Sequence, residues 1–109
     1  MILTHIRLHM RPEKSEETIR TFRGILEPTR VEPGCLEIRC GRDIEDENIL
    51  VIEEAWASSE DWQRHVRSMD YRITLSLLDS ARDQPDVRYY EVTESGGMEK
   101  ILEIGHCPY

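Results

Sequence analysis

The residues best suited to chemistry lie near the middle of the chain, where a strand-like segment ends at Trp56 and an amphipathic helix begins at a serine pair. The helix carries Trp62 and His65, which are three residues apart and therefore share one face. Because histidine titrates near neutral pH, a face with an apolar ring and an imidazole can either fill a core or line a pocket that transfers protons. Glu54, at the strand end, and Tyr71, further along the helical segment, complete the set of candidates.

Each of these side chains also has a purely structural interpretation. A single histidine beside apolar residues on a helix is more often a hydrogen-bonded packing residue than a catalyst. Trp62 can belong to the core, and Tyr71 can be a helix-start residue whose hydroxyl lies in water. Glu54 can be a solvated strand end or an ion-pair partner of Arg64. The pattern therefore leaves both interpretations open.

The remaining histidines and cysteines do not indicate a metal site. His5 and His9 lie on one face of a predicted strand, but a third ligand would have to come from elsewhere, so we interpret them as interface or solvent-facing residues. Cys35, Cys40 and Cys107 are odd in number and show no C-x-x-C spacing, which argues against a disulfide framework and a structural zinc site. Spacing along one strand would place Cys35 and Cys40 on opposite faces.

Composition limits the classes of partner. The chain has 109 residues, enough for one domain, and 22 acidic against 14 basic side chains give it a formal net charge of -8. Such a field repels phosphate backbones and anionic lipid surfaces, so we expect neither nucleic acid nor a membrane as a partner. The N-terminus lacks a basic start followed by a long apolar stretch, and we therefore predict a cytoplasmic protein.

Hydrophobic periodicity predicts strands and helices in alternation along residues 1–93. The predicted elements are a strand over 2–11, a helix over about 16–30, a strand over 35–43, a strand over 49–52, a helix from 58 that restarts near 70 and ends before 83, and a strand over 87–92. Ser15 is the predicted N-cap of the first helix, and a capping box at Ser58-Ser59-Glu60-Asp61 begins the second.

The same periodicity predicts which side chains face the core. They are Ile19, Phe22, Ile25 and Leu26 in the first helix, Leu36, Ile38 and Cys40 in the second strand, and Trp62, Val66, Met69, Tyr71, Ile73, Leu75, Leu77, Leu78 and Ala81 in the later helical segment.

The order strand, helix, strand, strand, helix, strand predicts an α+β, ferredoxin-like βαββαβ fold with an antiparallel sheet and two helices on one face. Ile49-Leu50-Val51-Ile52 is apolar at every position, so both sheet faces should be covered. In so small a chain the second cover would be another subunit. Residues 94–109 form a C-terminal extension with Met98, Ile101 and Leu102 at helical spacing, a short helix that would pack on its own or a partner subunit.

With these motifs placed, residues 1 to about 93 resemble the antibiotic biosynthesis monooxygenase family of dimeric α+β barrels, which includes the quinol monooxygenases. The residues that carry the resemblance are Arg11-Pro12-Glu13-Lys14, the helix end Glu27-Pro28-Thr29-Arg30-Val31-Glu32-Pro33-Gly34-Cys35, and Glu54-Ala55-Trp56 followed by Ser59, His65, Ser68 and Tyr71. The resemblance implies a homodimer through sheet-to-sheet packing and a ligand cavity between helices and sheet. It also implies oxygenation of a small aromatic, quinol or polyketide-like substrate with no metal, flavin or haem.

Chemistry of this kind needs only a base of suitable pKa, aromatic walls and a dry site, because a deprotonated phenol can itself give an electron to oxygen. His65 is the predicted base, since its unperturbed pKa lies near neutrality, and Glu54 would orient the imidazole or hold a hydroxyl. Trp56, Trp62 and Tyr71 would supply the walls of the substrate site.

Two alternatives remain at this stage. One is a non-catalytic dimeric module that binds a small ligand or a protein partner, since one fold serves many functions. The other is a haem-degrading monooxygenase of the same superfamily. Those proteins carry an asparagine on the first strand and a histidine on the second helical segment, where this chain has Ile6 and Leu75, so an axial ligand is not evident.

Overall fold

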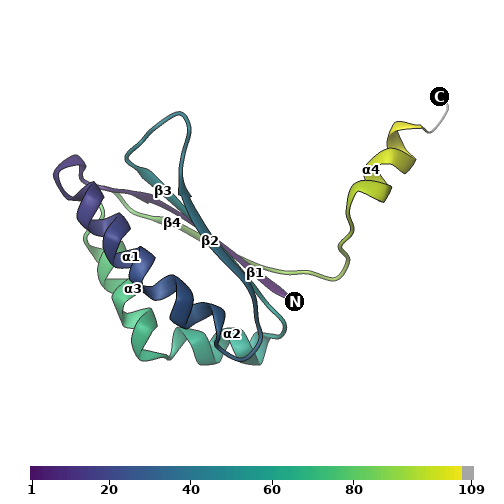
Figure 1. The fold of residues 1–109 in the computed structure, drawn as a ribbon, viewed down its shortest axis with the longest axis horizontal. Helices are drawn as coiled ribbons and strands as arrows, with labels where there is room; N and C mark the ends of the chain where they lie inside the picture. Colours follow the sequence, from purple (N-terminus) through teal and green to yellow (C-terminus); the bar gives the residue numbers. More distant parts are fainter. Residues whose placement is uncertain (107–109) are drawn as a thin grey trace.

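Four antiparallel strands form one sheet in the order β2-β3-β1-β4, and three helices cover one of its faces (Figure 1). The structure is a computed structural model that describes residues 1–106. Its elements are β1 (Ile2–His9), the 3-10 turn Pro12–Lys14, α1 (Ser15–Arg30), β2 (Cys35–Arg42), β3 (Ile49–Trp56), α2 (Ser59–Val66), α3 (Met69–Asp79), β4 (Asp86–Glu91) and α4 (Met98–Gly105). The predicted ferredoxin-like α+β fold is confirmed.

The core lies between the sheet and the helices. Alternate residues of β1 are buried there, and each faces its partner on β3, as in the pairs of Ile6 with Ile52 and Leu8 with Leu50. Phe22 and Ile25 of α1 pack against them. The same alternation places Thr4 and Glu54, which are also paired in register, on this helix-facing side of the sheet.

Two serine caps divide the predicted second helix. The Ser58 side chain accepts a hydrogen bond from the Asp61 amide at the start of α2, and Ser68 accepts one from the Tyr71 amide at the start of α3. The capping box was therefore correctly placed. The predicted Ser15 cap is wrong, because a 3-10 turn precedes α1 and makes Ser15 its first helical residue, with its hydroxyl donating to the Pro12 carbonyl.

Several predicted core positions are wrong, each for a local reason. On α1 the fully buried residues are Thr18, Phe22, Ile25 and Thr29, while Ile19 and Leu26 are half-buried but pack against the core as predicted. Helix α3 restarts at Met69, which turns Met69, Ile73 and Leu75 toward solvent. On α2 the buried residue is His65, whereas Trp62 and Val66 are only half-buried.

A bulge in β2 explains two further errors. The register shifts between Cys35 and Glu37, so Leu36 is the extra residue and is exposed. Because the bulge adds one residue, Cys35 and Cys40 both pack against the core instead of lying on opposite faces. Both are free thiols, and burial is the main cause that raises the pKa of each. Cys107 lies outside the described residues.

The opposite face of the sheet carries no helix in the described structure (Figure 1). Strand β4 continues into an extended segment that leads to α4, away from the body of the molecule. No helix within residues 1–106 combines the length and apolar character needed to cross a membrane.

Candidate active site

Glu54 is a buried carboxylate on the helix-facing side of β3. Its Oε1 accepts a hydrogen bond of 3.0 Å from Trp56 Nε1 and one of 3.3 Å from the Thr4 hydroxyl. Both donors are themselves buried. A buried carboxylate is costly unless it is hydrogen-bonded and paired with charge, so Glu54 requires a cationic neighbour.

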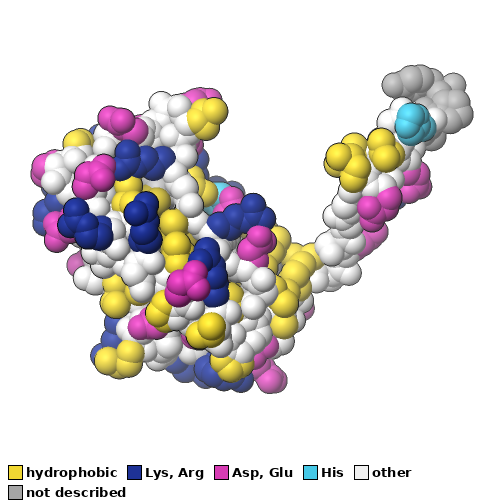
Figure 2. Space-filling view, viewed as in Figure 1, with side chains coloured by type: hydrophobic (Ala, Val, Ile, Leu, Met, Phe, Trp, Pro, Cys, Tyr) yellow, Lys and Arg dark blue, Asp and Glu magenta, His cyan; other side chains and the backbone are white. Residues whose placement is uncertain are grey.

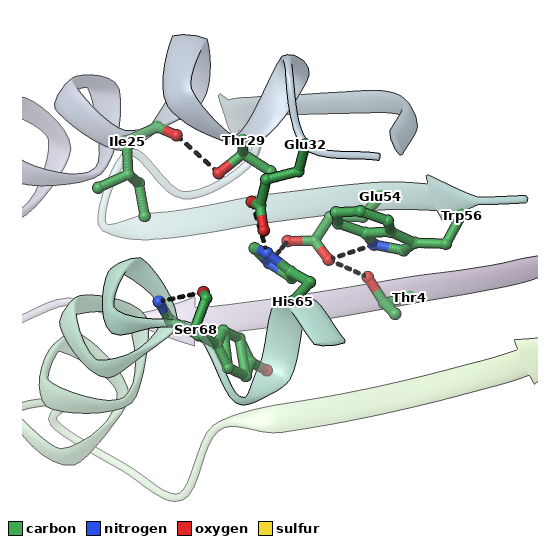
Figure 3. Close-up of polar contacts among 9 residues, drawn as sticks. Thr4, Ile25, Thr29, Glu32, Glu54, Trp56, His65 and Ser68 are labelled. Atoms are coloured by element: carbon green, nitrogen blue, oxygen red, sulfur yellow. Dashed lines mark hydrogen bonds and ion pairs between the residues drawn. The ribbon is translucent and has the colours of Figure 1, made fainter. Parts of the chain in front are cut away.

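His65 provides that neighbour from α2 and is only 2% exposed. Its Nδ1 lies 2.8 Å from Glu32 Oε2 and its Nε2 lies 3.5 Å from Glu54 Oε2, so the imidazole stands between two carboxylates (Figure 3). Nε2 makes no hydrogen bond to any atom of residues 1–106, and its contact with Glu54 is that of an ion pair. Nε2 is therefore the ring atom best placed to exchange a proton.

Glu32 reaches this position through the turn between α1 and β2. Its amide donates to the Thr29 carbonyl and its carbonyl accepts from the Cys35 amide. Within the turn Gly34 has φ +81°, and a Cβ there would lie 2.2 Å from the carboxyl group of Asp61. Only glycine satisfies both conditions, so Gly34 lets the turn pack against the start of α2, one helical turn from His65.

The two glutamates control the protonation of His65. Burial favours the neutral imidazole, but the contact with Glu54 and the negative charges of Glu54 and Glu32 together outweigh burial and raise the pKa of His65. His65 therefore keeps its proton to a higher pH than an ordinary histidine side chain does. A base of this kind gains its proton readily and acts only in the fraction that has lost it.

Two aromatic rings enclose the imidazole. The Trp56 ring, fully buried, stacks on His65 with centroids 4.5 Å apart, and the Tyr71 ring lies 5.1 Å from His65 on a tilted plane. Burial and the charge of Glu54 raise the pKa of the Tyr71 hydroxyl, which keeps it protonated and able to donate. Trp62 is not part of this cluster, because its ring stacks on Tyr89 of β4 at 4.9 Å.

The structure thus brings together four of the five predicted site residues, His65, Glu54, Trp56 and Tyr71. The fifth, Trp62, stacks on Tyr89 instead of on the imidazole. Sequence analysis missed Glu32, Thr4 and Tyr89 as members of the site. Thr4 could have been found from its position among the apolar, core-facing residues of β1. Arg64, suggested as a partner of Glu54, instead pairs with Asp61.

The other sheet face holds a shallow hollow of about 400 Å³. It is lined by side chains that alternate onto this face, Leu3, His5, Glu37, Glu53, Ala55, Asp86, Arg88 and Tyr90, and it also borders the strand positions of Thr4 and Glu54, whose side chains point to the helix-facing side. His5 lies 4.0 Å from Glu53, and His9 lies 3.5 Å from Asp83. Within residues 1–106 no group of three His, Cys, Asp or Glu side chains is arranged to hold a metal ion.

Solved structures share this fold. A Deinococcus radiodurans protein that bears the antibiotic biosynthesis monooxygenase name superposes with a TM-score of 0.81 at 20% identity, over 90% of this chain and 98% of that one. A conserved protein of Methanosarcina mazei gives 0.76 at 23% identity, over 82% and 89%. At these identities the likeness establishes the fold alone.

Sequence comparison establishes the family. An uncharacterised protein of Synechocystis is 22% identical over 89 residues, which cover 81% of this chain but only 60% of that protein's length. The sequence model described as antibiotic biosynthesis monooxygenase matches residues 1–75, which include the whole cluster around His65. The chain therefore belongs to the antibiotic biosynthesis monooxygenase family.

Proposed function

We propose that this protein is a monooxygenase that oxidises a small, electron-rich aromatic compound of the phenol, quinol or polyketide type, with molecular oxygen and no other cofactor. The observation that carries the proposal is the buried His65, held between Glu32 and Glu54 and stacked on Trp56. Family membership supports the reaction class. The five predicted residues, with Glu32 added, are the proposed site.

In this mechanism neutral His65 removes a proton from a substrate hydroxyl through Nε2. The imidazolium that forms is stabilised by the carboxylates of Glu32 and Glu54, which makes the proton transfer favourable in a dry site. Trp56 and Tyr71 provide the aromatic walls, and the Trp62 and Tyr89 stack forms the outer side of the site. Glu32 fixes the ring orientation by its contact with Nδ1.

When the substrate is a quinol, the quinolate gives one electron to O2, and the resulting semiquinone and superoxide combine to form a C–O bond. The peroxide takes back the proton from His65 and then loses water, which breaks the O–O bond and leaves one oxygen atom on the ring as a hydroxyquinone. The quinol supplies all four electrons that reduce O2, so one oxygen atom enters the product and the other enters water.

The test is oxygen uptake and product mass with ¹⁸O2 on a panel of hydroquinones, using protein treated with a metal chelator. We expect one ¹⁸O atom per product molecule and a rate that rises with pH above about 6.5, the ordinary pKa of histidine. His65→Gln should lower kcat about 100-fold or more. His5→Gln, on the other sheet face, is the matched control. Products without ¹⁸O, or equal rates in the two variants, would contradict the proposal.

One observation favours a second candidate, a non-catalytic dimeric module that binds a small ligand. The His65 cluster is closely packed, and the hollow of about 400 Å³ lies on the opposite face of the sheet. In that case the buried ion pairs would serve stability alone. Tight binding of phenols by wild type and His65→Gln alike, without oxygen uptake, would favour this candidate.

We also propose that the protein is a homodimer in which two sheets pack face to face. The open face carries apolar side chains, including Leu3, Val51 and Tyr90, beside charged groups of both signs. A second copy would cover these side chains and enclose the hollow described above. Sedimentation equilibrium at micromolar concentration should give twice the mass of the 109-residue chain.

A further inference from the structure

The C-terminal helix α4 presents an apolar face that residues 1–106 leave uncovered. Met98, Ile101 and Leu102 lie on one side of this eight-residue helix, and all three are exposed. Glu99, Lys100 and Glu103 lie on the other side, and Figure 2 shows the acidic and apolar side chains of α4 separated in this way. A helix of two turns is marginal in water unless its apolar face is covered, so α4 needs a docking surface.

The position of α4 favours a second copy as that surface. Beyond β4 the chain runs outward as an extended arm, and α4 ends on the side of the sheet opposite to α1, α2 and α3 (Figure 1). None of its residues is buried within the part of the chain that the structure describes. This is the side on which the second copy of the proposed homodimer would stack, so the inference rests on that dimer. By twofold symmetry each arm would reach the other copy.

The body of each copy offers a matching apolar flank. Strand β4 is not covered by the helical layer, so Val87 and Tyr89 are exposed although they point to the helix-facing side of the sheet. Beside them Leu75, Leu78 and Pro85 form the apolar part of a hollow of about 370 Å³ between α3 and the start of β4, whose rim also carries Asp79, Asp83 and Gln84. We call this surface, formed by Leu75, Leu78, Pro85, Val87 and Tyr89, the β4 flank.

The β4 flank adjoins the candidate active site. Tyr89, 62% exposed, stacks on Trp62, and Tyr71 on the neighbouring helix contacts His65. Any apolar segment lying on the flank would cover this aromatic stack from solvent. The site would then be closed on its outer side, which the dry chemistry of a reactive oxygen intermediate requires.

We infer that α4 of one copy docks on the β4 flank of the other, so that Met98, Ile101 and Leu102 of the partner form the outer wall of each active site. Each site is then built from two chains, and the wall added by α4 is apolar, which favours a substrate with an uncharged aromatic or alkyl part at that end. The arm also adds buried area to the dimer, which strengthens it.

The first test uses two variants of α4 that change its charge equally. Ile101→Glu with Leu102→Glu places two negative charges on the apolar face, whereas Lys100→Glu makes the same change of two charge units on the polar face. We expect the double variant to increase acrylamide quenching of Trp62 about twofold or more and to weaken the dimer at least tenfold. Trp56 is fully buried and should contribute little to the quenching. Lys100→Glu should behave as wild type.

The second test identifies which copy receives the helix. Chains carrying only Ile101→Cys are mixed with chains carrying only Val87→Cys and oxidised, with each single variant alone as the control for the natural cysteines. A cross-linked pair of chains in the mixture alone supports exchange of the arm. A cross-link that forms only when both substitutions are in one chain would mean that α4 folds back on its own body and would overturn the inference.

The two tests distinguish the docking of α4 from the proposed homodimer. If the wild type is a dimer and the double variant shows the same acrylamide quenching of Trp62, the docking of α4 is overturned while the proposed sheet packing stands. A monomeric wild type overturns both proposals. Oxygen uptake is not a readout of either test, so failure of the proposed oxygenase activity would be seen separately.

Discussion

The two faces of the sheet hold the same residue types in opposite environments. Glu53 and Glu54 are neighbours on β3, yet the Glu53 side chain is 59% exposed and that of Glu54 is 6% exposed. Each lies near a histidine, His5 for Glu53 and His65 for Glu54. An exposed pair contributes about 0 to 1 kcal/mol, whereas loss of one partner from a buried pair costs about 3 to 5 kcal/mol. Burial therefore decides which pair matters, although both contain the same groups.

Only the helix-facing side of the sheet is suited to proton transfer. On the open face, solvent competes with Glu53 and Asp83 for His5 and His9. On the helix-facing side, Trp56 excludes water from one side of the His65 ring while the two carboxylates raise the pKa of His65. The strand alternation of two residues is what separates the two environments.

The largest expected effect comes from removing the buried carboxylate. Glu54→Ala leaves Trp56 Nε1, the Thr4 hydroxyl and His65 without a shared acceptor, and we expect it to lower the free energy of unfolding by about 3 to 5 kcal/mol. Glu53→Ala, one residue away, should lower it by no more than about 1 kcal/mol. Urea unfolding followed by fluorescence measures both. Equal losses would mean that the faces do not differ in the way proposed.

A second prediction concerns pH. The folded state raises the pKa of His65 above the unfolded value of about 6.5, so its stabilising contribution is complete below pH 6.5 and is lost as pH rises through the folded pKa. Wild type should therefore become less stable over that interval. The decline should persist in His5→Gln and disappear in His65→Gln, as measured by urea unfolding at several pH values. A decline that survives in His65→Gln would assign the effect to another group.

The fold could be predicted from the sequence because the patterns that define each strand and helix lie within short stretches of residues. Strands, faces and a helix start are defined over short stretches by the alternation in β1, the apolar run at the start of β3 and the serine at position 58. The burial of Glu54 was left open, because the apolar run of residues 49–52 does not mark which face of the strand lies toward the core. The structure places Glu54 on the core-facing side with Leu50 and Ile52, where its carboxylate requires a buried partner.

The remaining errors arise from tertiary geometry. The contact of Glu32 with His65 joins residues 33 positions apart and depends on the turn at Gly34, whose packing against Asp61 has no local pattern. The bulge that exposes Leu36 is set by pairing with β3. The stacking of Trp62 on Tyr89 depends on how α2 lies over the edge strand. None of these can be obtained from propensity or periodicity.

Tyr89 and Tyr90 are neighbours on β4 whose side chains point to opposite faces of the sheet, and changes there should have the smallest effects. Tyr89→Leu removes the ring that stacks on Trp62 and should cost about 0.5 to 1.5 kcal/mol of stability while increasing acrylamide quenching of Trp62. Tyr90→Leu removes a ring of the same size from the open face and should leave Trp62 quenching unchanged. The quenching readout is needed because Tyr90 borders the proposed dimer surface, where a stability change alone could arise from weaker association. If both variants expose Trp62 equally, the division between the two faces does not extend to the edge strand, and the outer wall of the active site must be sought elsewhere.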